Sequence, residues 1–262
     1  PGFRGRATYS RDIRSANLSE LFTQSTTGYN TLTDPQTGQS VYVQNIGGGN
    51  RELRPEQANT FTGGFTYSPP SIGGLNLTVD YYDIKIDDVI TTIAPQDLVT
   101  RCYNGNADLC GQIDRDAAGT LIRTRSTYVN LSKYATSGID AEVSYLLPVS
   151  KLGLDGDGRL RVRLLGTWID SLTTDDGITQ IEYVRSQGYS FGLGVPKFRI
   201  SGSIGYDDQS WSFQARARYI SPGEYNSTQD IVNGHIGAYT YFDLQAAIRV
   251  PMGEGPGFEL YA

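Results

Sequence analysis

The sequence contains very few of the side chains that enzymes and metal proteins use for chemistry. Its 262 residues include one histidine, one methionine and two cysteines. The single histidine, His235, does not belong to a recognisable serine–histidine–acid set, and we expect it to be a solvated loop residue. One histidine and two cysteines also lack the spacing of a zinc site. We therefore expect no enzymatic activity, no catalytic residue, no metal site and no cofactor.

Long apolar runs are also missing. Hydrophobic residues make up 38% of the chain and the mean hydropathy is −0.35, which excludes a bundle of transmembrane helices. The net charge of −6 argues against a nucleic-acid partner. The composition is instead rich in tyrosine, with 18 residues, and in glycine, with 31, and this balance favours β structure.

Segments in which apolar and polar residues alternate follow one another along the chain. In one of them Phe198, Ile200 and Ile204 share a face opposite Arg199 and Ser201. Such segments span residues 75–81, 139–147, 160–168, 197–206, 211–219 and 242–250. At about nine residues each, most are long enough for a tilted strand to cross a bilayer. Aromatic residues near their ends suit an interfacial girdle: Tyr145, Trp168, Tyr206, Trp211, Tyr219, Tyr239 and Tyr241.

The connections between these segments are alternately short and long. The short ones are residues 68–75, 148–158, 206–211 and 251–257, and the long polar ones are residues 12–56, 91–132, 171–196 and 221–238. A barrel that spans an outer membrane places short turns at one end and long loops at the other. We therefore predict an all-β fold, an antiparallel transmembrane β-barrel segment built as an up-and-down meander. A soluble β-sandwich, whose strands also alternate, is the alternative.

Two local features of the strands carry predictions of their own. Gly63 and Gly64 lie inside the strand from Phe61 to Tyr67, where they indicate a bulge or a close contact. Between Tyr81 and Ile84 the apolar phase slips by one residue. Either a bulge lies there, or the strand has left the membrane by that point.

The two cysteines, Cys102 and Cys110, lie close together in a long polar loop. This spacing predicts a local disulfide in an oxidising compartment, with two free thiols as the alternative. A disulfide that closes so short a loop contributes about 2–3 kcal/mol, mainly by holding the loop itself.

Several ordered motifs resemble the barrel of TonB-dependent outer-membrane receptors. Residues 6–10 (RATYS) and 13–22 (IRSANLSELF) resemble a strand of R-A-x-Y type that leads into a P-x-x-x-E-L-F-like stretch, although Ala16 or Asn17 stands where a proline is common. Residues 49–56 (GNRELRPE) are similar to the family's G-N-x-x-L-x-P-E element. Residues 79–86 (VDYYDIKI) resemble its D-Y-Y-x-I-x-I strand, and residues 137–142 (SGIDAE) the G-x-E/D start of a later strand.

The resemblance covers essentially the whole chain and implies a fold, a place and a function. Residues 1–262 would be part of a barrel domain of about 22 strands, without the plug domain and the final strands. The complete protein would lie in the outer membrane of a Gram-negative bacterium and import a scarce solute such as a ferric siderophore, cobalamin or an oligosaccharide. Its partners would be outer-membrane lipid, its own plug domain and, through the plug, the TonB energy-coupling complex. A cysteine pair in this loop also fits many such receptors. A passive porin-type barrel is the alternative function.

Charged residues on the inward face are the first candidate site. We expect two arginine ladders and two carboxylates on the strand beside the first ladder: Arg159, Arg161, Arg163, Arg216, Arg218, Asp140 and Glu142. The carboxylates are placed to pair with the first ladder across the sheet. The family resemblance implies that such walls grip the plug domain, and the alternative is that these charges are simply solvated in a wet lumen.

Tyrosines in the long loops are the second candidate site. They are Tyr29, Tyr42, Tyr103, Tyr183, Tyr189 and Tyr225. Aromatic loop residues above a barrel mouth suit a flat or sugar-like ligand. Packing of loop against loop is the alternative role for each of them.

Overall fold

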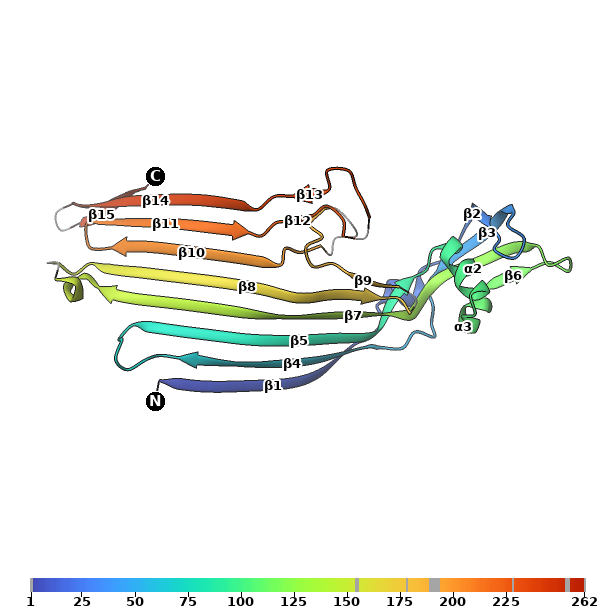
Figure 1. Ribbon diagram of the computed structural model, residues 1–262, viewed down its shortest axis with the longest axis horizontal. Helices are drawn as coiled ribbons and strands as arrows, with labels where there is room; N and C mark the ends of the chain where they lie inside the picture. The colour runs from blue at the N-terminus through green and yellow to red at the C-terminus, as the bar shows by residue number, and fades with distance from the viewer. Residues whose placement is uncertain are drawn as a thin grey trace.

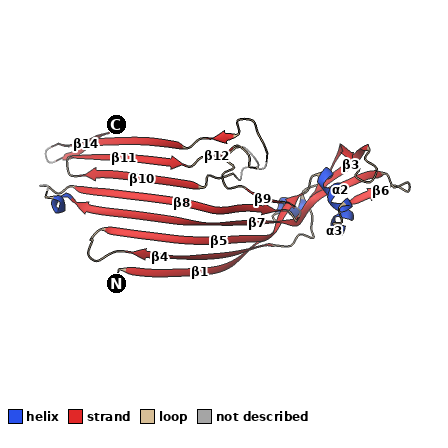
Figure 2. Cartoon of the chain, in the orientation of Figure 1, coloured by secondary structure: helices blue, strands red, loops and turns tan. Residues whose placement is uncertain are grey.

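The chain folds into a long, open sheet of antiparallel strands with both termini at the same end (Figure 1). The computed structural model describes residues 2–153, 156–177, 179–188, 194–227, 229–252 and 255–261, with the side chains of residues 251–259 excepted. Strands dominate and helices are few (Figure 2). Among the described residues no helix is long and apolar enough to cross a membrane.

Eight long strands and one shorter strand follow each other across the sheet in the described part of the chain. In spatial order they are β1 (Phe3–Arg14), β4 (Glu56–Tyr67), β5 (Leu75–Thr92), β7 (Leu121–Pro148), β8 (Arg159–Asp175), β10 (Phe198–Asp207), β11 (Trp211–Ile220), β14 (Tyr239–Met252) and β15 (Gly255–Tyr261). Each pairs antiparallel with its neighbours. The predicted all-β meander is confirmed.

The remaining elements lie in the connections. They are α1 (Leu18–Phe22), β2 (Thr26–Thr33), β3 (Ser40–Gly48), α2 (Pro95–Tyr103), α3 (Ala107–Cys110), β6 (Ile113–Arg115), η1 (Val149–Leu152), β9 (Gln180–Glu182), β12 (Gly223–Glu224) and β13 (His235–Ile236). The short connections, which join β4 to β5, β7 to β8 and β10 to β11, lie at the end of the sheet where β1 begins (Figure 1). The long connections lie at the opposite end, as the sequence predicts.

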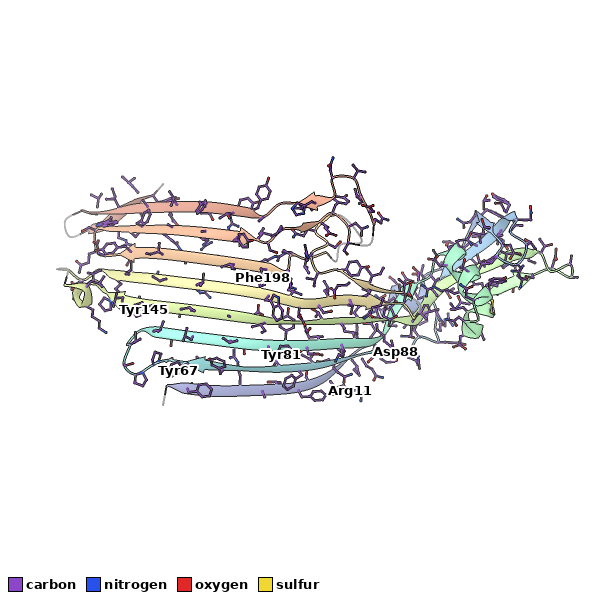
Figure 3. The ribbon with its side chains drawn as sticks, viewed as in Figure 1. Arg11, Tyr67, Tyr81, Asp88, Tyr145 and Phe198 are labelled. Carbon is purple, nitrogen blue, oxygen red and sulfur yellow. A yellow bond between two sulfur atoms is a disulfide. The ribbon has the colours of Figure 1, made fainter. Side chains whose placement is uncertain are left out.

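One face of the main sheet is apolar and uncovered. In the middle of the sheet Leu164, Ile200 and Ile204 are 46%, 40% and 45% exposed. The register brings apolar residues of neighbouring strands into rows, for example Phe198 opposite Trp168. Tyr67, Tyr81, Tyr145 and Phe198, labelled in Figure 3, belong to this face. A soluble β-sandwich would have to cover these side chains, whereas hydrocarbon can solvate them.

Five of the seven residues predicted for an aromatic girdle lie on the apolar face of the sheet, and two do not. Tyr145, Trp168, Tyr206, Trp211 and Tyr219 lie on the apolar face, and the rings of Tyr206 and Trp211 lie 4.5 Å apart. The prediction is wrong for Tyr239 and Tyr241. They stand opposite Ile220 and Arg218 on β11, so they belong to the polar face. The side chains of a strand alternate between its faces, and the apolar set of β14 begins only at Phe242.

The two clusters of buried apolar residues lie at the outer end of the molecule and not within the main sheet. We call the outer subdomain the unit made of β2, β3, β6, α2, α3 and residues 121–131 of β7 (Figure 1). Two clusters of buried side chains hold it together: Leu32, Val43, Val99 and Leu121 in the first, and Ile93, Leu98 and Leu109 in the second. The first two long connections are therefore folded structure, because alternating residues such as Val41 and Val43 find apolar partners in another loop.

The phase slip in β5 is not a bulge between Tyr81 and Ile84. Pairing of β5 with β7 runs without a break from Leu75 to Ile86, and the irregularity falls later, between Ile86 and Ile90. Asp88, labelled in Figure 3, has a φ of 57° at this point. The bulge alternative is therefore wrong at this position, and the departure of β5 from the membrane stays a prediction.

Candidate functional site

The polar face of the main sheet carries a row of charged residues at mid-height. Arg6 on β1 donates from Nε to Asp80 Oδ1 on β5 at 2.8 Å, across the strand β4. The residue between them is Gly64, and a Cβ there would collide with Asp80 Oδ1 and with the carbonyl of Val79. The close contact predicted at Gly63 and Gly64 is therefore real at Gly64. Sequence analysis missed Arg6 and Asp80, although strand alternation places both on the polar face.

Two of the predicted inward charges bind each other. Arg163 donates to Glu142 at 2.7 Å and 3.1 Å. Asp140, which stands directly opposite Thr167, accepts a hydrogen bond from its hydroxyl at 2.8 Å and not from an arginine. The reason is geometric, because the arginines of β8 lie nearer its turn end than Thr167 does.

In the second arginine ladder, Arg216 and Arg218, only one of the two arginines forms an ion pair with a described residue. Arg218 forms an ion pair with Asp243 at 3.2 Å, and its Cζ lies 5.7 Å from the centre of the Tyr241 ring. Arg216 stands opposite Asp243 in the register but forms no ion pair with any described residue. Salt bridges as exposed as these contribute little to stability, so their effect is mainly to orient the side chains.

Arg159 and Arg161 likewise have no ionic partner among the described residues. Together with Ser203, Gln214 and Gln245 they line a polar hollow at the turn end of the sheet. The predicted inward charges thus form two groups. Arg163, Arg218, Glu142 and Asp140 bind within the sheet, and Arg159, Arg161 and Arg216 have their guanidinium groups available to another surface.

The family-like motifs surround a polar cluster at the outer end of β1 and β4. Glu56 is 8% exposed and accepts hydrogen bonds from Arg14 at 2.7 Å and from the backbone N–H of Ile90 at 2.8 Å. Arg14 also bonds Glu20, which forms a capping box with Asn17 at the start of α1. Glu20 of the E-L-F-like element and Glu56 of the P-E element therefore hold α1, β4 and β5 to the outer end of β1 through Arg14 and Ile90.

The G-N pair of the same motif has a second structural task. A Cβ at Gly49 would lie 2.6 Å from the backbone of Leu21, so only glycine lets the two segments approach this closely. Asn50 donates to the carbonyl of Tyr128 on β7 at 2.9 Å. These residues thus position the first long connection against the second.

The four long connections are joined in series. The first and second share a sheet, in which β3 and β7 pair in parallel from Gln44 and Arg123 onward. Arg101 on α2 donates to the carbonyl of Asp176 at 2.8 Å and joins the second to the third. In the third connection the side chain of Gln187 donates to the carbonyl of Ser221 in the fourth at 2.9 Å. The result is a continuous outer rim.

A buried ion pair holds the outer subdomain. Asp34 is 1% exposed and accepts from both terminal nitrogens of Arg115, at 2.5 Å and 2.8 Å. These bonds lower the pKa of Asp34 below its ordinary value, against the opposing effect of burial. Sequence analysis missed this pair because its members are 81 residues apart.

Four of the predicted loop tyrosines are open to solvent. Tyr29, Tyr42, Tyr103 and Tyr225 are all between 45% and 72% exposed. The rings of Tyr29 and Tyr42 stack at 5.3 Å with an angle of 7°. Tyr183 is only 7% exposed, so it packs inside its loop and is not available to a solute in this structure. Tyr189 lies outside the described residues.

The structure contains the predicted disulfide between Cys102 and Cys110. It joins the end of α2 to α3, with the two Cα atoms 5.0 Å apart. Leu98 and Leu109, in the same two helices, belong to the second apolar cluster. The bond therefore fastens the helices over that cluster.

Several solved structures that resemble this chain are named as receptors. The siderophore receptor PirA of Acinetobacter baumannii has 12% identity and a TM-score of 0.58, over 99% of this chain and 34% of its own. The ferric enterobactin receptor PfeA of Pseudomonas aeruginosa, in complex with BCV-L6, has 14% identity and a TM-score of 0.59, over 95% of this chain and 31% of its own. A double mutant of the hemophore receptor HasR of Serratia marcescens has 16% identity and a TM-score of 0.52, over 95% and 32%.

The chain spans about a third of the length of these structures, and at such identities the likeness shows the fold. The comparison with curated proteins gave no match. The family model for the TonB-dependent receptor-like β-barrel matches residues 1–262. The chain therefore belongs to the TonB-dependent receptor-like β-barrel family, whose members are transporters of the Gram-negative outer membrane and not enzymes.

Proposed function

We propose that this chain forms part of the wall and the outer rim of a receptor that imports a scarce solute in a TonB-dependent way. The observation that carries the proposal is the two-faced sheet: its apolar side suits lipid, and its polar side carries guanidinium groups that have no ionic partner among the described residues. Among the solutes considered, an iron chelate such as a ferric siderophore is favoured over cobalamin or an oligosaccharide. The support for this choice is that similar structures are named as siderophore and hemophore receptors.

The polar face would be the seat of the plug domain of the complete receptor. Arg159, Arg161 and Arg216 are the residues on which this part of the proposal rests, because their charges are not satisfied within the described sheet. A plug surface with carboxylates or carbonyl groups would satisfy them by charge-assisted hydrogen bonds. The TonB complex would then act on the plug from the periplasmic side.

The exposed tyrosines of the rim would be the first contacts of the solute. Tyr42, Tyr103 and Tyr225 lie on segments that the interlocked connections hold in place, so little ordering entropy would be lost on binding.

Uptake measured with and without TonB tests the function. A strain that carries the complete receptor gene, and lacks its other siderophore receptors, is supplied with one ferric siderophore at a time under iron limitation. Growth and iron uptake that need both the receptor and TonB would support the proposal. Uptake that persists without TonB would instead indicate the passive porin-type barrel.

A further inference from the structure

A hollow of about 350 Å³ lies across β1, β4 and β5, on the same side of the main sheet as the apolar face. It is lined by Tyr9, Asn59, Phe61, Tyr81, Asp83 and Lys85. These residues stand at every second position of their strands, so all six side chains belong to one side of the sheet. Further strands of a barrel extend a sheet at its edges and do not cover its outer side. The hollow therefore opens to whatever surrounds the barrel.

The hollow lies where this side of the sheet changes from apolar to charged. On β5 the residues of this side are, in chain order, Leu77, Val79, Tyr81, Asp83, Lys85 and Asp87. Figure 3 shows Arg11, on the same side, nearer the outer end of the sheet than Tyr81. In an outer-membrane barrel the aromatic girdle lies at the membrane interface, so side chains just beyond it meet the lipid headgroups. The depth of the hollow thus suits a headgroup of the outer leaflet.

Two cations flank the polar end of the hollow. Arg11, Asn59 and Lys85 stand opposite one another on three neighbouring strands, so the Cα atoms of the two cations are about 10 Å apart. Arg11 donates to the side-chain carbonyl of Gln57 on β4, which holds its guanidinium over the sheet. Lys85 Nζ lies 3.3 Å from Asp83 Oδ1, with the two side chains 65% and 30% exposed. A pair this exposed is weak, so Lys85 can also bind an anionic oxygen of a ligand.

Three aromatic rings form the apolar end of the hollow. Tyr9, Phe61 and Tyr81 are 69%, 44% and 39% exposed. The hydroxyl of Tyr9 donates to Asn59 Oδ1 at 3.1 Å, which holds this ring beside the polar row. A tyrosine ring offers an apolar face and a polar edge together, and so suits a group that is itself apolar on one side and polar on the other.

The polar groups of the hollow define the chemistry of its ligand. Arg11 and Lys85 donate and carry positive charge, so they suit phosphate oxygens. Asp83 only accepts hydrogen bonds, so it suits a hydroxyl and would repel a phosphate placed against it. A neutral sugar would leave the two cations unused, and a simple phosphate would leave the carboxylate and the rings unused. A sugar that carries a phosphate matches all of these groups.

We propose that this hollow binds the phosphorylated sugar headgroup of a lipid of the outer leaflet. Arg11 and Lys85 hold the phosphate, Asp83 accepts from a sugar hydroxyl, and the ring of Tyr9 packs against the sugar. The acyl chains of the lipid then lie along the apolar face below Tyr81. The proposal rests on the proposed function in one respect, the placement of the apolar face against lipid.

Native mass spectrometry of the complete receptor in detergent, titrated with a bisphosphorylated, acylated glucosamine disaccharide, tests the proposal. Each cation near a membrane surface changes the affinity for an anionic lipid about fivefold, so Arg11→Gln with Lys85→Gln should raise the Kd roughly 25-fold. The control is Arg4→Gln with Lys151→Gln, which removes the same charge. Arg4 belongs to the polar face, opposite Thr66, and Lys151 lies in η1 at the turn end. The control should keep the Kd of the unaltered receptor, and equal Kd values for the two double variants would overturn the proposal.

Other ligands identify the group that is bound. The dephosphorylated disaccharide lipid and phosphatidylglycerol should both bind the unaltered receptor more weakly. Equal binding of either one would overturn the proposal, as would displacement of the lipid by inorganic phosphate, which would assign the hollow to the free anion.

Solute uptake separates this proposal from the proposed function. Both double variants should retain TonB-dependent uptake, which also shows that they fold. Absence of saturable lipid binding in a receptor whose uptake needs TonB would overturn only the lipid site. Uptake that does not need TonB would contradict the proposed function, while a raised Kd of the Arg11→Gln, Lys85→Gln variant would still support the lipid site.

Discussion

Arg6 on β1 binds Asp80 on β5, 74 positions further along the chain, although the strand β4 lies between them. The ion pair passes over Gly64, the one position on β4 that must have no side chain for the two groups to meet. The Arg6–Asp80 ion pair, which links β1 to β5 across β4, therefore requires a glycine at position 64.

Replacing this glycine should therefore destabilise the barrel. Gly64→Ala places a Cβ against Asp80 and Val79, and overpacking of this kind costs about 1–3 kcal/mol. Gly63→Ala is the matched control, because its Cβ would meet only the Phe61 ring, at 3.4 Å. Urea unfolding of the complete receptor in detergent measures the difference. Equal urea midpoints for Gly64→Ala and Gly63→Ala would contradict the inference that position 64 must lack a side chain.

The polar face predicts a difference between two neighbouring arginines of β8. Arg161→Glu should loosen the plug and raise the entry of small hydrophilic antibiotics, because Arg161 has no partner in the described sheet. Arg163→Gln should have a smaller effect on leakage, since Arg163 already binds Glu142. Antibiotic sensitivity of cells with equal receptor levels provides the measurement. Unchanged leakage in the Arg161→Glu strain would count against a plug-facing role.

Acid should loosen the outer subdomain at a defined pH. Because Arg115 lowers the pKa of Asp34, the stability from this pair is fully present above the ordinary aspartate pKa of about 3.9 and is lost as the pH falls through the lowered value. We expect the protection of the β2 and β3 amides against hydrogen exchange, relative to the intrinsic rate at each pH, to fall only below about pH 4.

A variant separates this ion pair from other acid effects. Arg115→Met leaves the buried carboxylate of Asp34 without its partner, and should cost about 1–3 kcal/mol at neutral pH. The same exchange measurement should then show β2 and β3 already loosened at pH 7. Exchange that does not change in this variant would refute the structural importance of the pair.

The disulfide should stabilise one part of the rim and not the barrel. Cys102→Ser together with Cys110→Ser removes about 2–3 kcal/mol of local stabilisation in the chain-entropy model. Limited proteolysis should then cut within residues 95–110 while the main sheet stays protected. Equal cleavage of the oxidised protein and the double variant would disprove the role.

The exposed tyrosines should differ from the buried one in solute binding. Loss of an aromatic contact weakens binding by about 0.5–1.5 kcal/mol, which is roughly a 2- to 12-fold rise in Kd. We expect this range for Tyr103→Ala and Tyr225→Ala once the solute is known. Tyr183→Phe, which keeps the buried ring, should bind as the unaltered receptor does. If the solute has the same Kd for all three variants, Tyr103 and Tyr225 do not contact it.

The long strands of the main sheet, the ends at which short and long connections lie, and the disulfide could all be predicted from the sequence. These features are local: alternation has a period of two residues, and Cys102 and Cys110 are eight residues apart. The motif at residues 49–56 was equally visible, although the anchoring tasks of Gly49, Asn50 and Glu56 were not.

Which distant segments meet could be seen only in the folded chain. Parallel pairing of β3 with β7, the Asp34–Arg115 pair and the Arg6–Asp80 contact each join residues more than 70 positions apart. Alternation shows which side chains share a face, but not which strand supplies the neighbour or which of several charges is nearest. For that reason the arginines with partners and those without looked alike in the sequence, and the packed outer subdomain looked like two polar loops.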